Sequence, residues 1–392
     1  MRIAIAGAGI GGLAAAALLR ADGHQVAVFD QFERPAPVGS GLVIQPVGQA
    51  VLKAVGVGSA VLAQGQRIVR MRGHEGGSGR IVLDVRYDRD NGGRFGLAVH
   101  RATLFDALFA TAKAAGAEIC PGQRVAAVEG APPRLVFADG VRSAPFDLVI
   151  DAAGAGSVLS PLVGRALPYG AVWGTVDWPA AAPFARDHLT QCYRRADRMM
   201  GVLPVGLVPD AAGRKATIFW SLPAAGHGDW LAQPLAAWKA EAAALWPEFA
   251  PLLDQIGDHR QMTMARYSHG TLARPWSDGL VHIGDAAHRA SPQLGQGANM
   301  ALLDAFALRA ALRMAEGREA LALYARLRRW HVRLYQGLSR AFTPQYQSDS
   351  RALPVLRDRV LSPLSRTWPL PGVLSRLVCG DLVRPFAGLA DD

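Results

Sequence analysis

The 392-residue sequence is poor in cysteine. Its three cysteines, Cys120, Cys192 and Cys379, are odd in number and far apart, which argues against a disulfide framework and against a thiolate metal cluster. The ten histidines include no HExxH pattern and no close pair of ligand type, so no metal site is expected. This cysteine usage predicts a reducing, cytoplasmic compartment.

Long hydrophobic runs and repeats are also missing. Hydrophobic residues make up 50% of the chain, yet no stretch is long and apolar enough to span a bilayer, so no membrane span is expected. No internal repeat or low-complexity segment is present. The length and composition allow a large core and one to three domains.

Glycines gather near the N-terminus in a pattern typical of dinucleotide binding. A strand-like run over 2–6 leads into Gly7, Gly9 and Gly12, an alanine-rich helix follows, and a second strand over 25–29 ends at Asp30. In this GxGxxG context the first glycine makes the turn, the second admits a pyrophosphate, the third permits close helix–strand packing, and the acid binds a ribose. A signal peptide is the alternative interpretation, but the glycines interrupt its apolar segment.

A second glycine-rich segment, residues 284–304, predicts a site for a flavin. Asp285 follows the strand-like run 280–283, where its carboxylate could accept hydrogen bonds from ribityl or ribose hydroxyls. Gly295 and Gly297 would let the backbone approach a planar ring. A helix that begins near 297–299 would direct its free N–H groups and positive dipole end toward that ring.

Together these motifs resemble those of the FAD-dependent monooxygenases related to p-hydroxybenzoate hydroxylase, over nearly the whole chain. Gly284-Asp285 matches the GD motif of that family, and Pro292-x-x-Gly-Gln-Gly-x-Asn matches its flavin-ring loop. The resemblance implies that FAD is the cofactor. The residues that it places at FAD are Gly7, Gly9, Gly12, Asp30, Arg34, Gln45, Arg101, Val125, Gly284, Asp285, Gly295, Gly297, Ala298, Asn299 and Met300.

One departure from the family concerns the electron source. Family members carry an aspartate and an arginine where this chain has Ala153 and Ser160, and those charges are associated with FAD and NAD(P)H. Two alternatives stay open: direct reduction by NAD(P)H, and delivery of reduced flavin by a separate reductase. Asp151 lies two positions early and would substitute for the aspartate only if the strand slipped in register.

The expected fold is α/β, with a Rossmann-like FAD-binding domain, an inserted antiparallel-sheet substrate domain and C-terminal helices. The FAD-binding domain is discontinuous over 1–67, 97–164 and 265–330, the substrate domain comprises 68–96 and 165–264, and 331–392 form a helical region. Within the insert we predict strands near 171–176, 190–193, 200–205 and 216–222, followed by a helix over 230–246.

The resemblance implies a monooxygenase that inserts one oxygen atom from O2 into an aromatic or heteroaromatic substrate through a flavin C4a-hydroperoxide. Alternation along the strand puts Gln191 and Tyr193 on one face, and these two, His288 and Pro292 are the candidate catalytic residues. An FAD-dependent oxidase or dehydrogenase of the same fold and a non-catalytic FAD-binding protein are the alternatives. A halogenase is disfavoured because no Trp-x-Trp-x-x-Pro run exists.

The formal net charge of +10 comes largely from arginine, since only four lysines are present. Between Arg309 and Arg384 there are fourteen arginines and five acids. These arginines alternate with leucine and alanine, which favours a solvated helix face over a nucleic-acid site. A positive field could still attract anionic aromatic acids or reduced flavin nucleotides.

Overall fold

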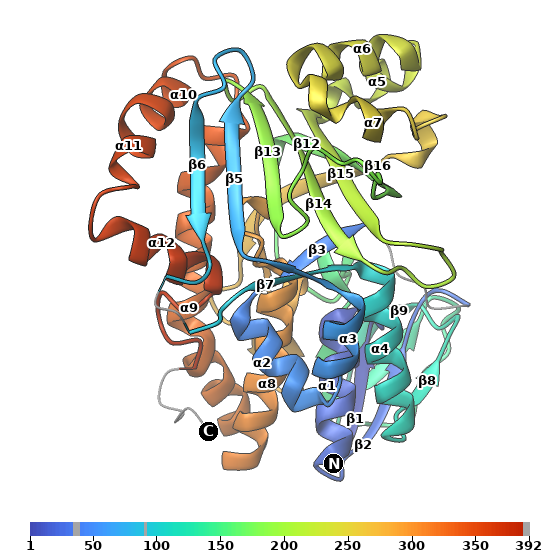
Figure 1. The fold of residues 1–392 in the computed structure, drawn as a ribbon. Helices are drawn as coiled ribbons and strands as arrows, with labels where there is room; N and C mark the ends of the chain where they lie inside the picture. The colour runs from blue at the N-terminus through green and yellow to red at the C-terminus, as the bar shows by residue number, and fades with distance from the viewer. Residues whose placement is uncertain (34–39, 90–91, 387–392) are drawn as a thin grey trace.

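The computed structural model describes residues 1–33, 40–89 and 92–386. Arg34, one of the predicted FAD contacts, lies outside the described residues. The fold is mixed α/β, with one mainly parallel and one mainly antiparallel large sheet (Figure 1).

The first large sheet has six strands in the order β17-β18-β11-β1-β2-β8. All neighbours are parallel except β17 and β18. Its alternate residues face two cores, one under α1, α4 and α8 and the other under the β9–β10 hairpin. The bounds are β1 Arg2–Ala6, α1 Ile10–Ala21, β2 Gln25–Phe29, α4 Arg101–Ala114, β8 Glu118–Cys120, β9 Val125–Glu129, β10 Arg134–Phe137, β11 Leu148–Asp151, β17 Trp276–Ser277, β18 Leu280–His282 and α8 Gly297–Met314.

The second large sheet has eight strands in the order β19-β16-β12-β15-β14-β13-β5-β6. Its neighbours are antiparallel except β13 and β5, which are parallel, so the prediction of an antiparallel sheet was wrong at this pair. The bounds are β5 Arg70–Glu75, β6 Ile81–Arg86, β12 Arg165–Asp177, β13 His188–Arg194, β14 Arg198–Gly206, β15 Lys215–Pro223, β16 Thr263–Thr271 and β19 His288–Arg289.

Short helices cover one face of the eight-stranded sheet. The helix predicted over 230–246 is in fact two, α5 (His227–Ala232) and α6 (Leu235–Leu245). Pro234, the N-cap of α6, separates them, because proline lacks the N–H that would continue the first helix. With α7 (Ala250–Leu253) these helices bury the side of the sheet that carries Met200 and Trp220.

The remaining elements lie between the two large sheets or, with α9, along one side of the molecule (Figure 1). A three-stranded sheet in the order β3-β7-β4 lies between the two large ones. The bounds are β3 Gly41–Ile44, α2 Pro46–Val55, α3 Gly58–Gln64, β4 Gln66–Ile68, β7 Gly96–His100, α9 Gly317–Tyr346, α10 Ala352–Leu356, α11 Ser362–Leu364 and α12 Leu370–Cys379.

The predicted domain division stays a prediction. Two of its boundaries, at 264/265 and 330/331, run through β16 and α9, which are continuous there. Across the described ranges, no helix has the length and apolar character needed to cross a membrane.

Asp22, the C-cap of α1, holds the first helix to α8. Its carboxylate accepts hydrogen bonds from Arg309 at 2.6–3.0 Å and from Arg313 at 2.6–2.7 Å. Burial alone would raise the pKa of Asp22, but the two guanidinium groups lower it from 3.8 to about 2. The ionised form is therefore the one that the fold stabilises.

We expect Asp22→Asn to lower the free energy of unfolding at pH 7 by about 2 kcal/mol, the equivalent of the pKa shift. Because the folded-state pKa is depressed, this contribution is present above pH 3.8 and is lost as the pH falls toward 2. Urea unfolding of wild type and variant at pH 7 and pH 3 measures the difference. Asp254→Asn, at an exposed position without an ion pair among the described residues, is the control. A difference that stays constant with pH would contradict this account.

Candidate functional site

A cleft of about 360 Å³ opens where the carboxyl ends of β1, β2 and β11 meet the start of α1. Five of the residues predicted to contact FAD line it, although they come from distant parts of the sequence: Gly7, Gly9, Asp30, Arg101 and Val125. Ala153 lines the same cleft. Carboxyl ends of parallel strands are the usual ligand-binding edge of such sheets, so we name this the nucleotide cleft.

The three glycines of the GxGxxG motif differ in what surrounds them. Gly7 has a φ of 105°, which side chains rarely adopt, and a Cβ there would lie 2.6 Å from the Ala152 carbonyl oxygen. A Cβ on Gly12 would collide with the Gly7 carbonyl oxygen, so α1 approaches the strand only because that residue is glycine. A Cβ on Gly9 would meet no protein atom within 4 Å. Gly9 therefore borders open space, as the close approach of a phosphate requires.

Asp30 is fixed at the end of β2 by backbone donors. Its Oδ2 accepts the N–H of Ala8 at 2.8 Å and its Oδ1 accepts the N–H of Phe32 at 3.0 Å. Each carboxylate oxygen has a further lone pair that can accept a ribose hydroxyl.

Arg101 and Asp285 are two charged groups with incomplete hydrogen bonding. The Nε of Arg101, at the first position of α4, is buried and has no hydrogen-bond partner, and burial lowers the pKa of this guanidinium. Asp285 is solvent-accessible, yet the chain encloses it enough to raise its pKa, against the opposing charges of His288 and Arg101. An orphaned cationic donor beside open space at Gly9 fits a pyrophosphate.

A buried carboxylate on α8 anchors the GD turn. The Asp304 carboxylate accepts hydrogen bonds from the backbone N–H of Gly284 at 2.8 Å and from the Arg328 Nε at 2.7 Å. It also contacts the His288 Nε2 at 2.7 Å. Burial alone would raise the pKa of Asp304, but His288 and Arg328 lower it to about 2. His288 is thus held by Asp304 on the side of α9, and its Nε2 has a partner already.

The predicted flavin-ring loop is tied down by Asn299. Its Oδ1 accepts the N–H of Gln45 at 2.8 Å, and its Nδ2 donates to the carbonyls of Val43 and Gly295 at 3.1 and 2.9 Å. The Asn299 side chain is therefore used within the protein. Gln45 is 2% exposed, and its Oε1 has no partner.

The neighbouring positions of that loop offer backbone to a ligand. A Cβ on Gly297 would meet nothing within 4 Å, and Gly297 and Ala298 begin α8 as predicted. Met300 is buried, and its Sδ accepts the Arg328 Nη2 at 3.4 Å. Any ring contact made at 297–300 would come mainly from backbone groups.

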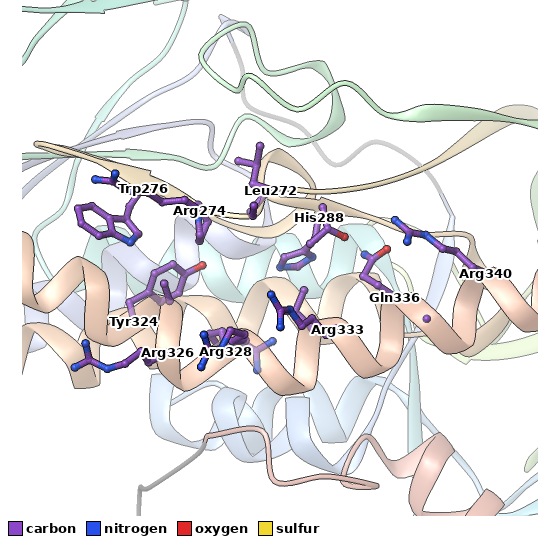
Figure 2. Close-up of a pocket in the computed structure, with 18 residues that line it drawn as sticks. Leu272, Arg274, Trp276, His288, Tyr324, Arg326, Arg328, Arg333, Gln336 and Arg340 are labelled. Atoms are coloured by element: carbon purple, nitrogen blue, oxygen red, sulfur yellow. The ribbon is translucent and has the colours of Figure 1, made fainter.

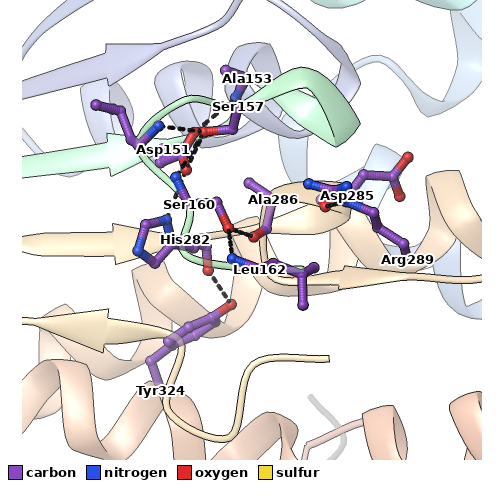
Figure 3. Close-up of polar contacts among 11 residues, drawn as sticks. Asp151, Ala153, Ser157, Ser160, Leu162, His282, Asp285, Ala286, Arg289 and Tyr324 are labelled. Carbon is purple, nitrogen blue, oxygen red and sulfur yellow. Dashed lines mark hydrogen bonds and ion pairs between the residues drawn. The ribbon is translucent and has the colours of Figure 1, made fainter. Parts of the chain in front are cut away.

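The loop with the two missing charges is organised by Asp151 (Figure 3). This buried carboxylate accepts the Ser157 hydroxyl at 2.7 Å and the Ala153 N–H at 3.1 Å, and contacts the His282 Nδ1 at 2.7 Å. The pairing of β1 with β11 has no register shift, and Asp151 lies opposite Ala6. Asp151 therefore does not move into the position of Ala153.

Ser160 forms a hydrogen bond in the place of the family arginine. Its hydroxyl donates to the Ala286 carbonyl at 2.5 Å and so links this loop to the GD turn (Figure 3). Ala153 presents an exposed methyl group to the nucleotide cleft. The cleft consequently has neither of the two charges that the family carries there.

Gln191 and Tyr193 share a face of β13, as predicted, and lie together. The Tyr193 hydroxyl donates to the Gln191 Oε1 at 2.7 Å, and both side chains are buried. The Arg357 guanidinium carbon lies 5.0 Å from the centre of the Tyr193 ring. Met200 and Trp220 lie on the opposite face of the sheet, under α5–α7.

The other two candidate catalytic residues, Pro292 and His288, lie outside β13: His288 is in β19 and Pro292 follows that strand. Pro292 starts a single turn, 292–294, whose Gln293 donates to Gln347 at 2.8 Å. Asp304 and Arg328 were not predicted from the sequence, and Asp151 was named there only as a substitute for the family aspartate after a register slip. Their only local signal is a charge beside or within an apolar run, which does not identify a partner.

Comparison with known proteins places the chain among flavoproteins. The profile of a family described as "FAD binding domain" matches residues 1–333. The chain is 32% identical over 348 residues to 3-amino-4-hydroxybenzoate 2-monooxygenase of Streptomyces cremeus. This alignment covers 84% of this chain and 83% of that protein. It is 28% identical over 353 residues to aurachin C monooxygenase/isomerase of Stigmatella aurantiaca, with 84% and 85% covered.

Solved structures share the fold. Klebsiella pneumoniae HpxO in complex with FAD and uric acid aligns with a TM-score of 0.81 at 22% identity, over 97% of this chain and 98% of that one. A 2-methyl-3-hydroxypyridine-5-carboxylic acid oxygenase aligns with a TM-score of 0.77 at 21% identity, over 93% and 98%.

Two glycine variants separate packing from ligand space. We expect Gly9→Ala to leave the melting temperature of the apoprotein nearly unchanged and to weaken FAD binding at least about tenfold, because its methyl group enters only the open space. Gly12→Ala should lower the free energy of unfolding by about 2 kcal/mol, because its methyl group meets backbone. Thermal melts and FAD titration measure both effects. Equal loss of stability in the two variants would show that Gly9 does not border a ligand site.

Proposed function

Because the chain belongs to the family of FAD-dependent aromatic hydroxylases, we propose that it is a monooxygenase that inserts one oxygen atom of O2 into an aromatic or heteroaromatic ring. The observation that carries this proposal is the nucleotide cleft. An unpartnered buried Arg101 Nε, open space at Gly9 and a lining acid at Asp30 meet there.

Bound FAD would supply the activation of dioxygen, and the protein would supply binding and positioning. We infer that Gly7, Gly9 and the start of α1 hold the pyrophosphate together with Arg101. Asp30 would accept the adenosine ribose hydroxyls, and Asp285 those of the ribityl chain.

The start of α8 would face the ring of the flavin. The backbone at Gly297 borders open space, and the N–H groups of this first turn carry partial positive charge. They would stabilise negative charge on a reduced flavin. Val125 lines the nucleotide cleft and would lie beside the adenine.

We further propose the division into a discontinuous FAD-binding domain and an inserted substrate domain. The face of the eight-stranded sheet opposite α5–α7 would carry the substrate contacts. On it lie Gln191 and Tyr193, together with Met199 and Phe219.

Tyr193 would act as a neutral hydrogen-bonding group. Burial raises its pKa well above the usual value of 10.0, although the Arg357 charge opposes the shift. Tyr193 is thus protonated at neutral pH and cannot serve as the base for a phenolic substrate. Tyr193→Phe should therefore lower the rate by a similar factor at pH 6 and pH 9, and a loss confined to the higher pH would contradict this role.

The electron source is proposed from what lines the cleft at Ala153. The absence of charge at Ala153 and Ser160 supports delivery of reduced flavin by a separate reductase, with direct reduction by NAD(P)H as the alternative. The same absence favours a second candidate function, an FAD-dependent oxidase or dehydrogenase that inserts no oxygen.

Isotope labelling separates the monooxygenase from the oxidase. FAD-loaded protein, reduced chemically, is exposed to ¹⁸O₂ with a panel of hydroxylated and amino-substituted aromatic acids and quinolones. We expect a product that contains one oxygen atom from O2, seen by mass spectrometry. If the substrate is oxidised, hydrogen peroxide is formed and the product carries no label, the result would favour the oxidase.

Restoring a charge at Ala153 tests the electron source. We expect Ala153→Asp to speed anaerobic bleaching of the flavin by NADPH at least about tenfold over wild type, equivalent to about 1.4 kcal/mol of barrier. Ala153→Asn, which has the same size without the charge, is the matched control. Reduction of the wild type within seconds, unchanged in Ala153→Asp, would contradict the proposal of a separate reductase.

A further inference from the structure

A second cleft, of about 420 Å³, lies between α9 and the segment 271–276 (Figure 2). None of its lining residues is acidic. Six are arginines, Arg274 on the segment and five on α9, namely Arg326, Arg328, Arg329, Arg333 and Arg340. We call it the arginine cleft. Its volume lies within the range of small-molecule sites, on the order of 300–1,000 Å³.

Five of these arginines lack a carboxylate partner. Arg328 is bound to Asp304, but the other five form no ion pair with any carboxylate in the described residues. Arg274 instead covers the Trp276 ring at 3.9 Å. Like charges gathered around one recess raise its positive potential and favour an anion with several acceptor oxygens.

A buried glutamine side chain in the cleft indicates that a ligand there carries a hydrogen-bond donor as well as negative charge. Gln336 lines the cleft and is 4% exposed, yet its Oε1 has no hydrogen-bond partner. In Figure 2 it lies between His288 and Arg340 along the cleft. A buried amide oxygen without a donor is costly, and a ligand hydroxyl would satisfy it.

We propose that the arginine cleft is a second ligand site that binds a phosphate ester with free hydroxyls, as in a nucleotide. Phosphate oxygens accept hydrogen bonds from arginines on both walls, and a sugar hydroxyl donates to the Gln336 Oε1. The site is separate from the nucleotide cleft, since the two share no lining residue. The proposal does not depend on the function proposed above.

The test is calorimetric titration of the FAD-saturated protein with ADP, FMN and inorganic pyrophosphate. Flavin absorbance confirms that the nucleotide cleft stays filled. We expect one ADP or FMN per chain, bound more tightly than pyrophosphate and more weakly as salt is raised. Tighter binding of ADP or of FMN shows which of these two phosphate esters the cleft prefers. Absence of binding, or pyrophosphate bound as tightly as either nucleotide, would overturn the proposal.

Three variants assign the binding to this cleft. Arg274→Gln/Arg333→Gln removes one charge from each wall and should weaken ADP binding at least about tenfold. Arg359→Gln, at an exposed position outside the cleft, is the matched control and should change it less than about twofold. Gln336→Leu should weaken ADP but not pyrophosphate, without loss of stability, because it removes an unpartnered acceptor. ADP binding unchanged in the double variant would refute the assignment.

Discussion

The carboxylate of Asp304 is the constraint on which the site depends. It is 0% exposed, and its three partners belong to the GD turn, to the strand after that turn, and to α9. A buried charge is tolerated only when it is paired and hydrogen-bonded, so these three elements have one arrangement relative to α8. Since α8 begins at the predicted flavin-ring loop, Asp304 sets the position of the GD turn and of that loop together.

Asp151 likewise fixes neighbouring segments, on the other side of the GD turn. It holds the loop 153–160, and Ser160 then joins that loop to the backbone at Ala286. The two carboxylates are therefore structural. Among the described residues whose buried polar atoms have no hydrogen-bond partner are Arg101, Gln45 and Gln336. The first lines the nucleotide cleft and the last the arginine cleft. Where the protein leaves buried polar atoms unsatisfied, a ligand is the simplest group to complete them.

Much of the nucleotide cleft was predictable because its signals are local. A strand, a glycine turn and a helix in immediate succession identify Gly7, Gly9 and Gly12, and the start of α8 follows from the glycines before it. The parallel pairing of β13 with β5 was missed, since no local pattern records which strand is its neighbour. The partners of His288 and Asp151 were missed for the same reason: Asp151 and His282 are 131 residues apart in sequence. The break at Pro234 had a local signal, which helical periodicity obscured.

The most direct test of the central claim is the structure of the protein bound to FAD. The account predicts the pyrophosphate over Gly9 within hydrogen-bonding distance of the Arg101 Nε, and the flavin ring against the backbone at 295–298. It also predicts that the contacts of Asp304 and Asp151 stay as they are. An adenosine pyrophosphate bound outside the nucleotide cleft, or a ring that does not contact the start of α8, would contradict it.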